Sequence, residues 1–507
     1  MLLSLHRITF TYEGALKPLF DTVSASFPEG WTGIVGANGA GKTTLLRLAC
    51  GEIEPQHGSI HRPARIIYCP QRTDDAPSLL REFMPALDAQ ACTLRGKLRI
   101  GEDWLCRWDT LSHGERKRAQ IAVALWQSPG VLAVDEPTNH IDADARNLLM
   151  DALSAFRGIG LIVSHDRELL DTLCEQCLFI DPPNAVMRPG GYTEGSAQAR
   201  REDEHLRDEY DRAKQTAKQI TQEATRRRQD ASKANRMRSK RGISPRDHDA
   251  KGKINRARIT GSDGNAGRLA SQLDGRSRQA EERLSEFHLK RRYETDFWLE
   301  GSRSHRDVLF AVPAGELPLG ENRRLVFPEL VMAPDDRIAV TGPNGYGKST
   351  LVRHIMGLLT LPEDKVIYVP QEIDLPASRR IMEHVNGLGK EQLGRVMTLV
   401  SSLGSRPERL IGSNEASPGE IRKVLLALGV ARSPHLIIMD EPTNHLDLPA
   451  IECLEDALDA CPCGLILVSH DYRFLSRLAR TRWHLSPDNP GDRDVRLRIM
   501  DAESMPG

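Results

Sequence analysis

The stretch Gly36-Ala-Asn-Gly-Ala-Gly41-Lys42-Thr43 decides the fold of this chain, because it returns as Gly342-Pro-Asn-Gly-Tyr-Gly347-Lys348-Ser349. Each copy follows a short apolar run and precedes a helical pattern, which is the strand, loop and helix order that a phosphate-binding loop requires. The glycines let backbone N–H groups curl around phosphates, and the helix N-terminus adds a favourable dipole. We therefore expect two nucleotide sites, built on Lys42 and Lys348.

A second motif follows each loop at almost the same distance. The acidic pairs Asp135-Glu136 and Asp440-Glu441 end apolar runs, with the aspartates 93 and 92 positions after the loop lysines. Each run predicts a buried parallel strand, which delivers its acidic pair to the carboxyl edge of the sheet, where ligands bind. A buried acidic pair without a cation is costly. We expect the aspartates to support Mg²⁺ and the glutamates to orient or deprotonate the attacking water, as phosphoryl transfer requires. The chain thus contains an internal repeat.

Length and composition predict a protein of roughly three domain-sized units within 507 residues. The longest apolar runs are far shorter than the roughly 20 residues of a membrane-spanning helix, and the N-terminus shows no secretion signal. We expect a cytoplasmic protein without a membrane segment. Nine cysteines are scattered along the chain and form no disulfide framework. Cys174 and Cys177 have metal-like spacing without a second pair near them, so we expect buried thiols.

The basic residues are concentrated in the middle of the chain. Residues 226–258 hold thirteen Lys/Arg and three Asp, a local charge of +10, whereas the whole chain has a net charge of −1. This asymmetry indicates an anionic partner. Residues 196–240 and 276–298 are rich in Ala, Arg, Glu, Lys and Gln and predict long polar helices. Glycine and proline residues between them predict the tip of an antiparallel hairpin. A polar helix pair could also be a simple spacer.

Three further motifs, each present twice in the same order, make the chain resemble a tandem ATP-binding cassette protein. The signature loop reads Leu111-Ser-His-Gly-Glu115 and Ala416-Ser-Pro-Gly-Glu420, each serine lying 23 positions before the acidic pair's aspartate. Tyr-Cys-Pro-Gln71 and Tyr-Val-Pro-Gln371 match the Q-loop, and Val-Ser-His165 and Val-Ser-His470 match the switch histidine. The resemblance implies an α/β fold of two P-loop NTPase cassettes joined by a long helical hairpin, in domains 1–195, 196–300 and 301–507.

The resemblance also implies the residues of each site. In such proteins two cassettes face head to tail, so Ser417, Gly419 and Glu420 would complete the ATP site of Lys42, and Ser112, Gly114 and Glu115 that of Lys348, within one monomer. The implied catalytic residues are Glu136, Glu441, His165 and His470. The implied Mg²⁺ residues are Thr43, Gln71, Asp135, Ser349, Gln371 and Asp440. The implied ATP-binding residues are, besides the signatures, Tyr12, Gly36, Asn38, Gly39, Gly41, Lys42, Thr43, Thr44, Gln71, Gly342, Asn344, Gly345, Gly347, Lys348, Ser349, Thr350 and Gln371.

The two copies depart from the usual pattern in different ways. Tyr12 lies where cassettes place an aromatic residue against adenine, whereas the second copy offers Val312, which predicts weaker stacking there. His113 replaces a signature glycine in the first copy, and the second has Ala416 and Pro418. Tyr346 fills a loop position usually held by a small residue. We expect two hydrolytic sites of unequal rate.

The full arrangement resembles the ABC-F family. The resemblance rests on the two cassettes, the repeated Glu-Pro-Thr-Asn-His-(Ile/Leu)-Asp after both buried strands, and the basic helical linker. Members act on the ribosome, where the linker enters the tRNA exit site; some are translation factors and others protect ribosomes from antibiotics. This resemblance implies a ribosome partner, with rRNA and tRNA contacted through residues 226–258 along phosphate backbones.

Two other functions remain open from the sequence. The chain could be the ATP-hydrolysing subunit of a membrane transporter, which requires a separate membrane partner. It could also be a DNA-associated structural ATPase, which requires tight, salt-sensitive binding to duplex DNA. The residues do not distinguish a translation factor from a resistance protein, nor do they select a drug.

Overall fold

The structure, a computed structural model, describes residues 1–63, 65–139, 141–237, 262–285, 302–320, 323–403, 405, 410, 417–444, 446–489 and 493–501. It has two compact units. One combines Met1–Gly195 with Tyr293–Gly507 and contains both copies of the repeat, and the other is Ser196–Arg292. We call residues 1–195 the first half and the described residues from 302 onward the second half.

The first half is built on a mainly parallel sheet in the order β5-β6-β7-β3-β8-β9, with a smaller antiparallel sheet β2-β1-β4. Its strands are β1 Leu3–Phe10, β2 Phe20–Phe27, β3 Gly30–Gly36, β4 His57–His61, β5 Ile66–Cys69, β6 Val131–Asp135, β7 Ile159–Val163, β8 Cys174–Asp181 and β9 Asn184–Pro189. Its helices are α1 Lys42–Cys50, α2 Leu80–Phe83, α3 Ala89–Lys97, the 3-10 turn η1 Trp108–Thr110, α4 His113–Trp126, α5 Ala143–Ser154 and α6 Arg167–Leu173.

The second half repeats this plan in an eight-stranded sheet of order β11-β12-β19-β18-β14-β17-β16-β15, beside the pair β10-β13. Its strands are β10 Phe310–Val312, β11 Gly315–Pro318, β12 Arg324–Phe327, β13 Leu330–Met332, β14 Arg337–Thr341, β15 Val366–Val369, β16 Leu436–Asp440, β17 Gly464–Val468, β18 Thr481–Pro487 and β19 Val495–Asp501. Its helices are α10 Lys348–Leu358, the 3-10 turn η2 Glu363–Lys365, α11 Leu375–Asn386, α12 Lys390–Ser402, α14 Pro418–Val430, α15 Leu448–Ala460 and α16 Tyr472–Leu478.

The central strands of both sheets are buried and place the acidic pairs as the sequence predicts. All five residues of β6 and of β16 are buried. Each strand pairs in parallel with its neighbour in the same register, so that Asp135 lies opposite Val163 and Asp440 lies opposite Val468. The carboxyl ends of parallel strands meet at one edge, so the acidic pairs and the residues that follow β7 and β17 share an edge. The predicted α/β fold is confirmed.

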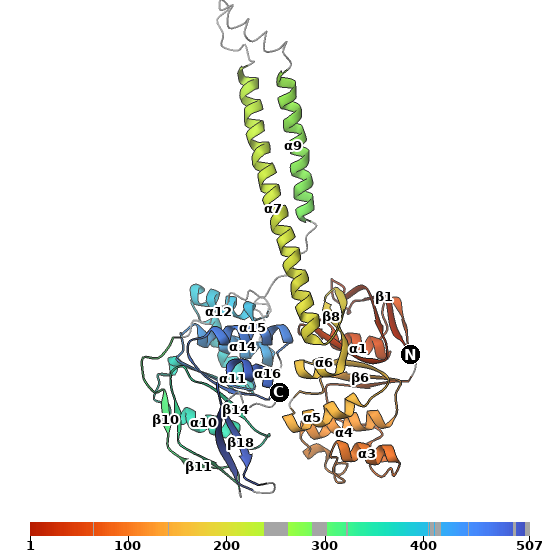
Figure 1. Cartoon of the computed structure of the whole chain (residues 1–507), viewed down its shortest axis with the longest axis vertical. Coiled ribbons are helices and arrows are strands. Elements are labelled where there is room, and N and C mark those ends of the chain that lie inside the picture. Colours follow the sequence, from red (N-terminus) through yellow and green to blue (C-terminus); the bar gives the residue numbers. More distant parts are fainter. Residues whose placement is uncertain are drawn as a thin grey trace, which may run out of the picture. The chain divides into compact units, whose positions relative to one another are not determined.

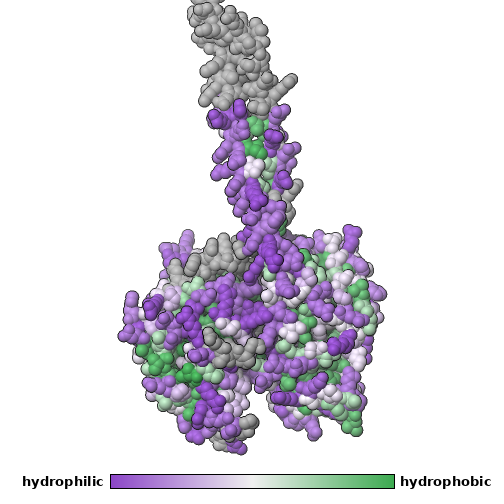
Figure 2. Space-filling model, in the orientation of Figure 1, coloured by the Kyte–Doolittle hydropathy of each residue, from purple (hydrophilic) through white to green (hydrophobic). Residues whose placement is uncertain are grey.

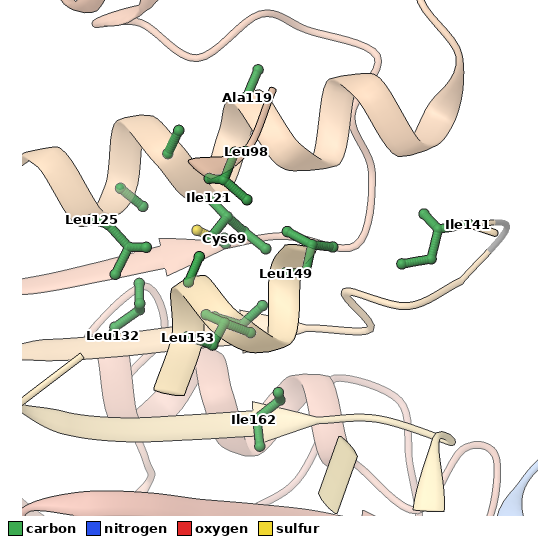
Figure 3. Close-up of a cluster of buried hydrophobic side chains, with 14 of the residues drawn as sticks. Cys69, Leu98, Ala119, Ile121, Leu125, Leu132, Ile141, Leu149, Leu153 and Ile162 are labelled. Carbon is green, nitrogen blue, oxygen red and sulfur yellow. The ribbon is translucent and has the colours of Figure 1, made fainter. Parts of the chain in front are cut away.

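Apolar side chains on both faces hold each sheet in place. Between the first sheet and helices α4 and α5, Figure 3 shows Leu132 and Ile162 from the strands with Ile121, Leu149 and Leu153 from the helices. Each of these five side chains is fully buried. Burying a leucine or isoleucine contributes about 1.5–3 kcal/mol relative to exposure. This packing fixes the start of α4, which carries the signature residues, against the strands that carry the acidic pair.

The second unit is a pair of long helices. α7 Tyr192–Met237 and α9 Ser262–Ser285 run side by side (Figure 1). Ala217 and Ala224 lie one heptad apart and are buried, which is the spacing of a helix–helix seam. The Thr221 and Ser277 hydroxyl oxygens lie 3.0 Å apart across the pair. The described part of the face seen in Figure 2 is mostly hydrophilic, as expected for two helices held together along one narrow seam.

The second helix begins earlier than the sequence analysis predicts. α9 starts at Ser262 rather than at residue 276 and includes Gly264, Gly267 and Gly275. Each glycine inside a helix costs about 1 kcal/mol relative to alanine, but this cost does not end a helix that has a partner helix to pack against. Arg226 and Arg227 are exposed. The side chains of Arg228 and of 230–237, residues 238–261, which include most of the predicted tip, and residues 286–298 lie outside the described part.

Gly160 tests how tightly the first sheet is packed. A Cβ at this position would lie 2.3 Å from the Trp31 ring, and that ring is fixed by a hydrogen bond from Trp31 Nε1 to the Leu153 carbonyl at 3.0 Å. We expect Gly160→Ala to destabilise the full chain by roughly 1–3 kcal/mol, measured as a fall in Tm. Gly96→Ala is the control, because no atom lies within 4 Å of its added Cβ. A Tm for Gly160→Ala equal to that of the native chain would contradict this packing.

Candidate nucleotide sites

The phosphate loops have the conformation that their glycines predict. Gly39 and Gly41 have φ values of 76° and 98°, and Gly345 and Gly347 have values of 77° and 90°, a region that other residues rarely adopt. Gly41 and Gly347 directly precede α1 and α10, which begin at Lys42 and Lys348. The backbone therefore turns sharply from strand to helix and presents the helix N-terminus where a phosphate would bind.

Both loop lysines are buried beneath their own loops. Lys42 Nζ donates to the carbonyls of Gly36 at 2.9 Å and Ala37 at 3.3 Å. Lys348 Nζ donates to those of Gly342 at 2.6 Å and Pro343 at 3.2 Å. Burial lowers the pKa of both lysines, and neighbouring carboxylates partly offset this effect. Each ammonium group is therefore held at the loop, where a triphosphate chain would pass.

The hydroxyl that follows each lysine meets the aspartate of the acidic pair. Thr43 Oγ1 donates to Asp135 Oδ2 at 2.8 Å, and Ser349 Oγ donates to Asp440 Oδ2 at 2.6 Å. Burial raises the pKa of both aspartates. Asp135 Oδ1 is buried and has no hydrogen-bond donor among the described residues. An oxygen-only set with an unsatisfied carboxylate oxygen is suited to Mg²⁺, so the chemistry of Thr43 and Asp135 fits that ion. The predicted roles of Gln71 and Gln371 stay predictions.

The glutamates occupy a strained backbone position one residue further on. Glu136 and Glu441 have φ values of 45° and 50°, which is uncommon for a residue other than glycine and clusters at functional sites. Their amides donate to the carbonyls of Val163 at 2.9 Å and Val468 at 2.8 Å. This pairing to the next strand turns each side chain toward its switch histidine. Burial raises the pKa of Glu136 to about 7 and that of Glu441 to about 8.

The two switch histidines have different surroundings. His165 Nε2 lies 3.1 Å from Glu136 Oε1. His470 Nε2 lies 3.6 Å from Glu441 Oε1, but it is also 3.0 Å from Lys348 Nζ and 3.0 Å from Asn344 Oδ1. Burial and the nearby Lys348 lower the pKa of His470 to about 3, so its imidazole is neutral at physiological pH.

Each signature serine caps the helix that it begins. Ser112 Oγ and Ser417 Oγ accept hydrogen bonds from the amides of Glu115 and Glu420, whose side chains bond back to the serine amides, at α4 and α14 respectively. These are capping boxes. Pro418 lies at the first position of α14, where a missing N–H leaves no helical bond unmade. The predicted departures at His113 and Pro418 therefore leave the helix starts intact.

A cavity of about 440 Å³ surrounds the second phosphate loop. Its lining includes the predicted residues Gln371, Lys348, Ser349, Asp440, Glu441 and His470, and from the first half Asn139, Arg146 and His165. The first signature residues Ser112, Gly114 and Glu115 are described but do not line this cavity. Predicted residues from both halves thus meet here, while the signature residues remain outside.

The two residues at the predicted adenine positions differ in exposure. Tyr12 is about half exposed, its hydroxyl lies 2.7 Å from Thr44 Oγ1, and its ring packs edge-on against Phe10. Val312 is 1% exposed in β10, so its side chain is not available to a base. Pro318, Leu319 and Gly320 instead line the cavity beside Thr350. Tyr472 also lines this cavity.

The sequence analysis did not assign a role to two aspartates at these sites. Asp142 and Asp447 end the repeated Glu-Pro-Thr-Asn-His motif and cap α5 and α15. Asp447 Oδ2 also accepts a hydrogen bond from the Asn38 amide of the first phosphate loop at 2.7 Å, and Asp142 raises the pKa of Lys348. Both aspartates lie seven residues after the aspartate of the acidic pair, and this repeated spacing could have identified them from the sequence.

Comparison with known proteins agrees with the internal repeat. The model of the ABC transporter family matches residues 20–139 and 328–444. The tylosin resistance ATP-binding protein TlrC of Streptomyces fradiae is 31% identical over 561 residues, which cover 95% of this chain and 97% of TlrC. The ribosome protection protein VmlR of Bacillus subtilis is 28% identical over 492 residues, which cover 94% of this chain and 85% of VmlR.

A solved structure of RNase-L Inhibitor superposes with a TM-score of 0.61 at 18% identity, over 97% of this chain and 90% of that chain; this likeness concerns the fold alone. The two matching halves and their sites define a tandem ATP-binding cassette protein, and the halves are called cassettes from here on. Within that class, the chain belongs to the ABC-F proteins. No helix among the described residues has the length and apolarity needed to span a membrane.

The raised pKa values of the glutamates predict how stability depends on pH. The stability that each protonated glutamate contributes is fully present below its ordinary pKa of 4.5. This stability is lost as the pH rises through the folded-state pKa values of about 7 and about 8. Without nucleotide or Mg²⁺, we therefore expect Glu136→Gln/Glu441→Gln to have a higher Tm than the native chain at pH 8.5, by a few degrees, and nearly the same Tm at pH 5. Glu13→Gln, at an exposed position, is the control. A Tm difference independent of pH would contradict the prediction.

Proposed function

We propose that this protein is a cytoplasmic, monomeric ATPase that acts on the ribosome, and that ATP binding and hydrolysis control its association with rRNA and tRNA. The observation that supports the proposal most strongly is the pairing of two complete ATP-site residue sets with one long polar hairpin. The relatives named for ribosome protection and tylosin resistance cover almost the whole chain. The proposal includes both translation-factor and ribosome-protection roles.

The residues of each site suit hydrolysis of ATP to ADP and phosphate. The phosphate loop and its lysine hold the triphosphate, and the threonine or serine hydroxyl and the aspartate hold Mg²⁺, with Gln71 and Gln371 completing its environment. These residues would hold Mg²⁺, whose positive charge would offset the negative charge that develops on the phosphate oxygens during the reaction. Glu136 and Glu441 orient or deprotonate the attacking water, since their raised pKa values match a general base near neutral pH. His165 Nε2 and His470 Nε2 lie 3.1 Å and 3.6 Å from these carboxylates.

ATP also acts as the contact between cassettes. Ser417, Gly419 and Glu420 would complete the site of Lys42, and the first signature would complete that of Lys348. In this closed state the signature residues at the starts of α4 and α14 would contact the γ-phosphate of the ATP bound to the other cassette, and hydrolysis removes that phosphate. Closing therefore creates contacts that exist only with ATP, which is the requirement for a ligand-driven two-state switch.

The hairpin supplies the contact with RNA. The +10 charge of residues 226–258 is sufficient to follow a phosphate backbone without reading bases. Arg226 and Arg227, at the start of this segment, are exposed on α7. The described helices are too polar to bury against a protein core, which agrees with a solvent-exposed arm.

Glu136→Gln/Glu441→Gln tests the ATP dependence. Glutamine keeps the shape of the side chain but cannot accept the proton from water, so ATP remains bound and the closed state accumulates. We expect the variant to co-sediment with ribosomes in ATP and not in ADP. Lys42→Ala/Lys348→Ala is the control, because it lacks the ammonium groups that hold the triphosphate, and it should not co-sediment in either nucleotide. Confirmed ATP binding without co-sedimentation would favour a transporter subunit or a DNA-associated ATPase.

Charge reversal tests the hairpin. The sequence places Arg236, Arg238, Lys240 and Arg241 on the basic segment, and their side chains lie outside the described residues. Changing all four to Glu should abolish ribosome co-sedimentation of the trapped protein while ATP binding stays at the native level. The matched control reverses four exposed cassette arginines, namely Arg303, Arg379, Arg380 and Arg395. Equal loss in both variants would mean that overall charge, rather than the hairpin, governs binding.

A further inference from the structure

The signature helix α4 of the first cassette carries a lysine that is completely buried. Lys117 is 0% exposed, and its Nζ donates to the Pro70 carbonyl at 2.7 Å and to Gln120 Oε1 at 2.9 Å. Gln120, one turn further along α4, donates from Nε2 to the Arg72 carbonyl at 3.5 Å. Pro70 and Arg72 are the two neighbours of Gln71. Lys117 and Gln120 therefore hold the backbone on both sides of Gln71 by hydrogen bonds.

The same lysine also reaches the acidic pair. Lys117 Nζ lies 3.5 Å from the backbone carbonyl of Asp135. Three parts of the cassette thus meet at one ammonium group: the helix that begins with the signature, the segment that carries Gln71, and the strand that ends at Asp135. The signature belongs to the ATP site of the other cassette, whereas Gln71 and Asp135 belong to the site of Lys42.

The second cassette lacks this arrangement. Arg422 and Leu425 occupy the positions of Lys117 and Gln120, counted from the signature serines. Arg422 Nη1 donates to the carbonyls of Glu441 at 3.3 Å and Asn444 at 3.0 Å, which belong to the segment after the buried strand β16 and not to the Q-loop segment. Leucine has no polar side-chain atom with which to hold the segment around Gln371. Among the described residues, hydrogen bonds from the signature helix to the Q-loop segment are therefore found in the first cassette and not in the second.

Stability alone does not account for a buried lysine at this position. Taking an ammonium group out of water costs several kcal/mol, and hydrophobic residues of similar volume are often equally or more stabilising. Burial lowers the pKa of Lys117 to about 8, which reflects this cost. The compensating hydrogen bonds all go to the Q-loop, to Gln120 and to the carbonyl of Asp135, so the residue favours one placement of Gln71 relative to Asp135.

We propose that Lys117 and Gln120 are positioning residues that hold Gln71 beside Asp135, so that both oxygens are in place for the Mg²⁺ of ATP bound to the first cassette. The inference rests on the proposed function, in that ATP and Mg²⁺ bind at this site. Residues that orient metal ligands typically change metal affinity 10–100-fold when mutated. The first cassette should therefore depend on Lys117 for its metal affinity, and the second should not.

The test is Mn²⁺ binding, followed by electron paramagnetic resonance with saturating ATP in the full chain. The Glu136→Gln/Glu441→Gln background prevents turnover, so the readout is binding and not activity. Adding Lys117→Met should weaken one of the two Mn²⁺ sites roughly 10-fold and leave the other unchanged. Lys117→Arg should restore most of the affinity, because arginine keeps a charged donor and is accommodated at the same position in the second cassette. Gln120→Leu introduces the residue that the second cassette has at this position, Leu425, and should weaken the same Mn²⁺ site. This variant tests the proposal if Lys117→Met does not fold.

Arg118→Met is the matched control. Arg118 lies beside Lys117 on α4 and also donates to backbone carbonyls, those of Leu98 at 2.7 Å and Arg99 at 3.4 Å, but these belong to the segment after α3. Its Tm can fall while both Mn²⁺ sites keep their affinity. The proposal is overturned if Lys117→Met and Gln120→Leu bind two Mn²⁺ as tightly as the background, or if Arg118→Met weakens the same site equally. A native chain without Mg²⁺-dependent ATP hydrolysis would instead overturn the proposed function.

Discussion

Two adjacent carboxylates at the end of a fully buried strand are the constraint around which each cassette is organised. Asp135-Glu136 and Asp440-Glu441 are buried, and uncompensated charges at such positions are costly. The surroundings offset this cost with a hydroxyl on each aspartate, a loop lysine and a histidine beside each glutamate. The positive φ of both glutamates shows that the backbone is strained to place them. The fold thus holds a site that only a cation and a phosphate chain fully satisfy.

The same scaffold gives the two cassettes different buried polar contacts. His165 approaches its glutamate, whereas His470 also lies beside Lys348 and Asn344. The lysine of the first signature helix reaches the Q-loop, and the arginine at the same position in the second reaches the segment after the acidic pair. Neither difference changes a strand or helix boundary. The two copies of the repeat can therefore have different buried polar contacts while they keep the same fold.

Regular spacing made much of this structure predictable. The apolar runs before Asp135 and Asp440 form the buried strands, and the glycine-rich loops open α1 and α10, because these signals are local and occur twice. The role of Asp447 was not predictable in this way, since its contact with the Asn38 amide joins residues 409 positions apart. The early start of α9 was missed because glycines were weighted as helix breakers, whereas packing along α7 outweighs their modest cost.

Two of the ion pairs that join the cassettes involve residues that closely follow the switch histidines in sequence. Arg167, two residues after His165, forms an ion pair with Glu455 of α15 through both carboxylate oxygens. Arg473, three residues after His470, lies 2.7 Å from Asp171. Glu455 is 3% exposed, and removing one partner of a buried ion pair is strongly destabilising because it leaves a buried charge without compensation. The helices α6 and α16 therefore follow the switch histidines directly and also carry ion pairs between the cassettes. A histidine displaced by a change at the γ-phosphate would move the start of the helix that carries this join.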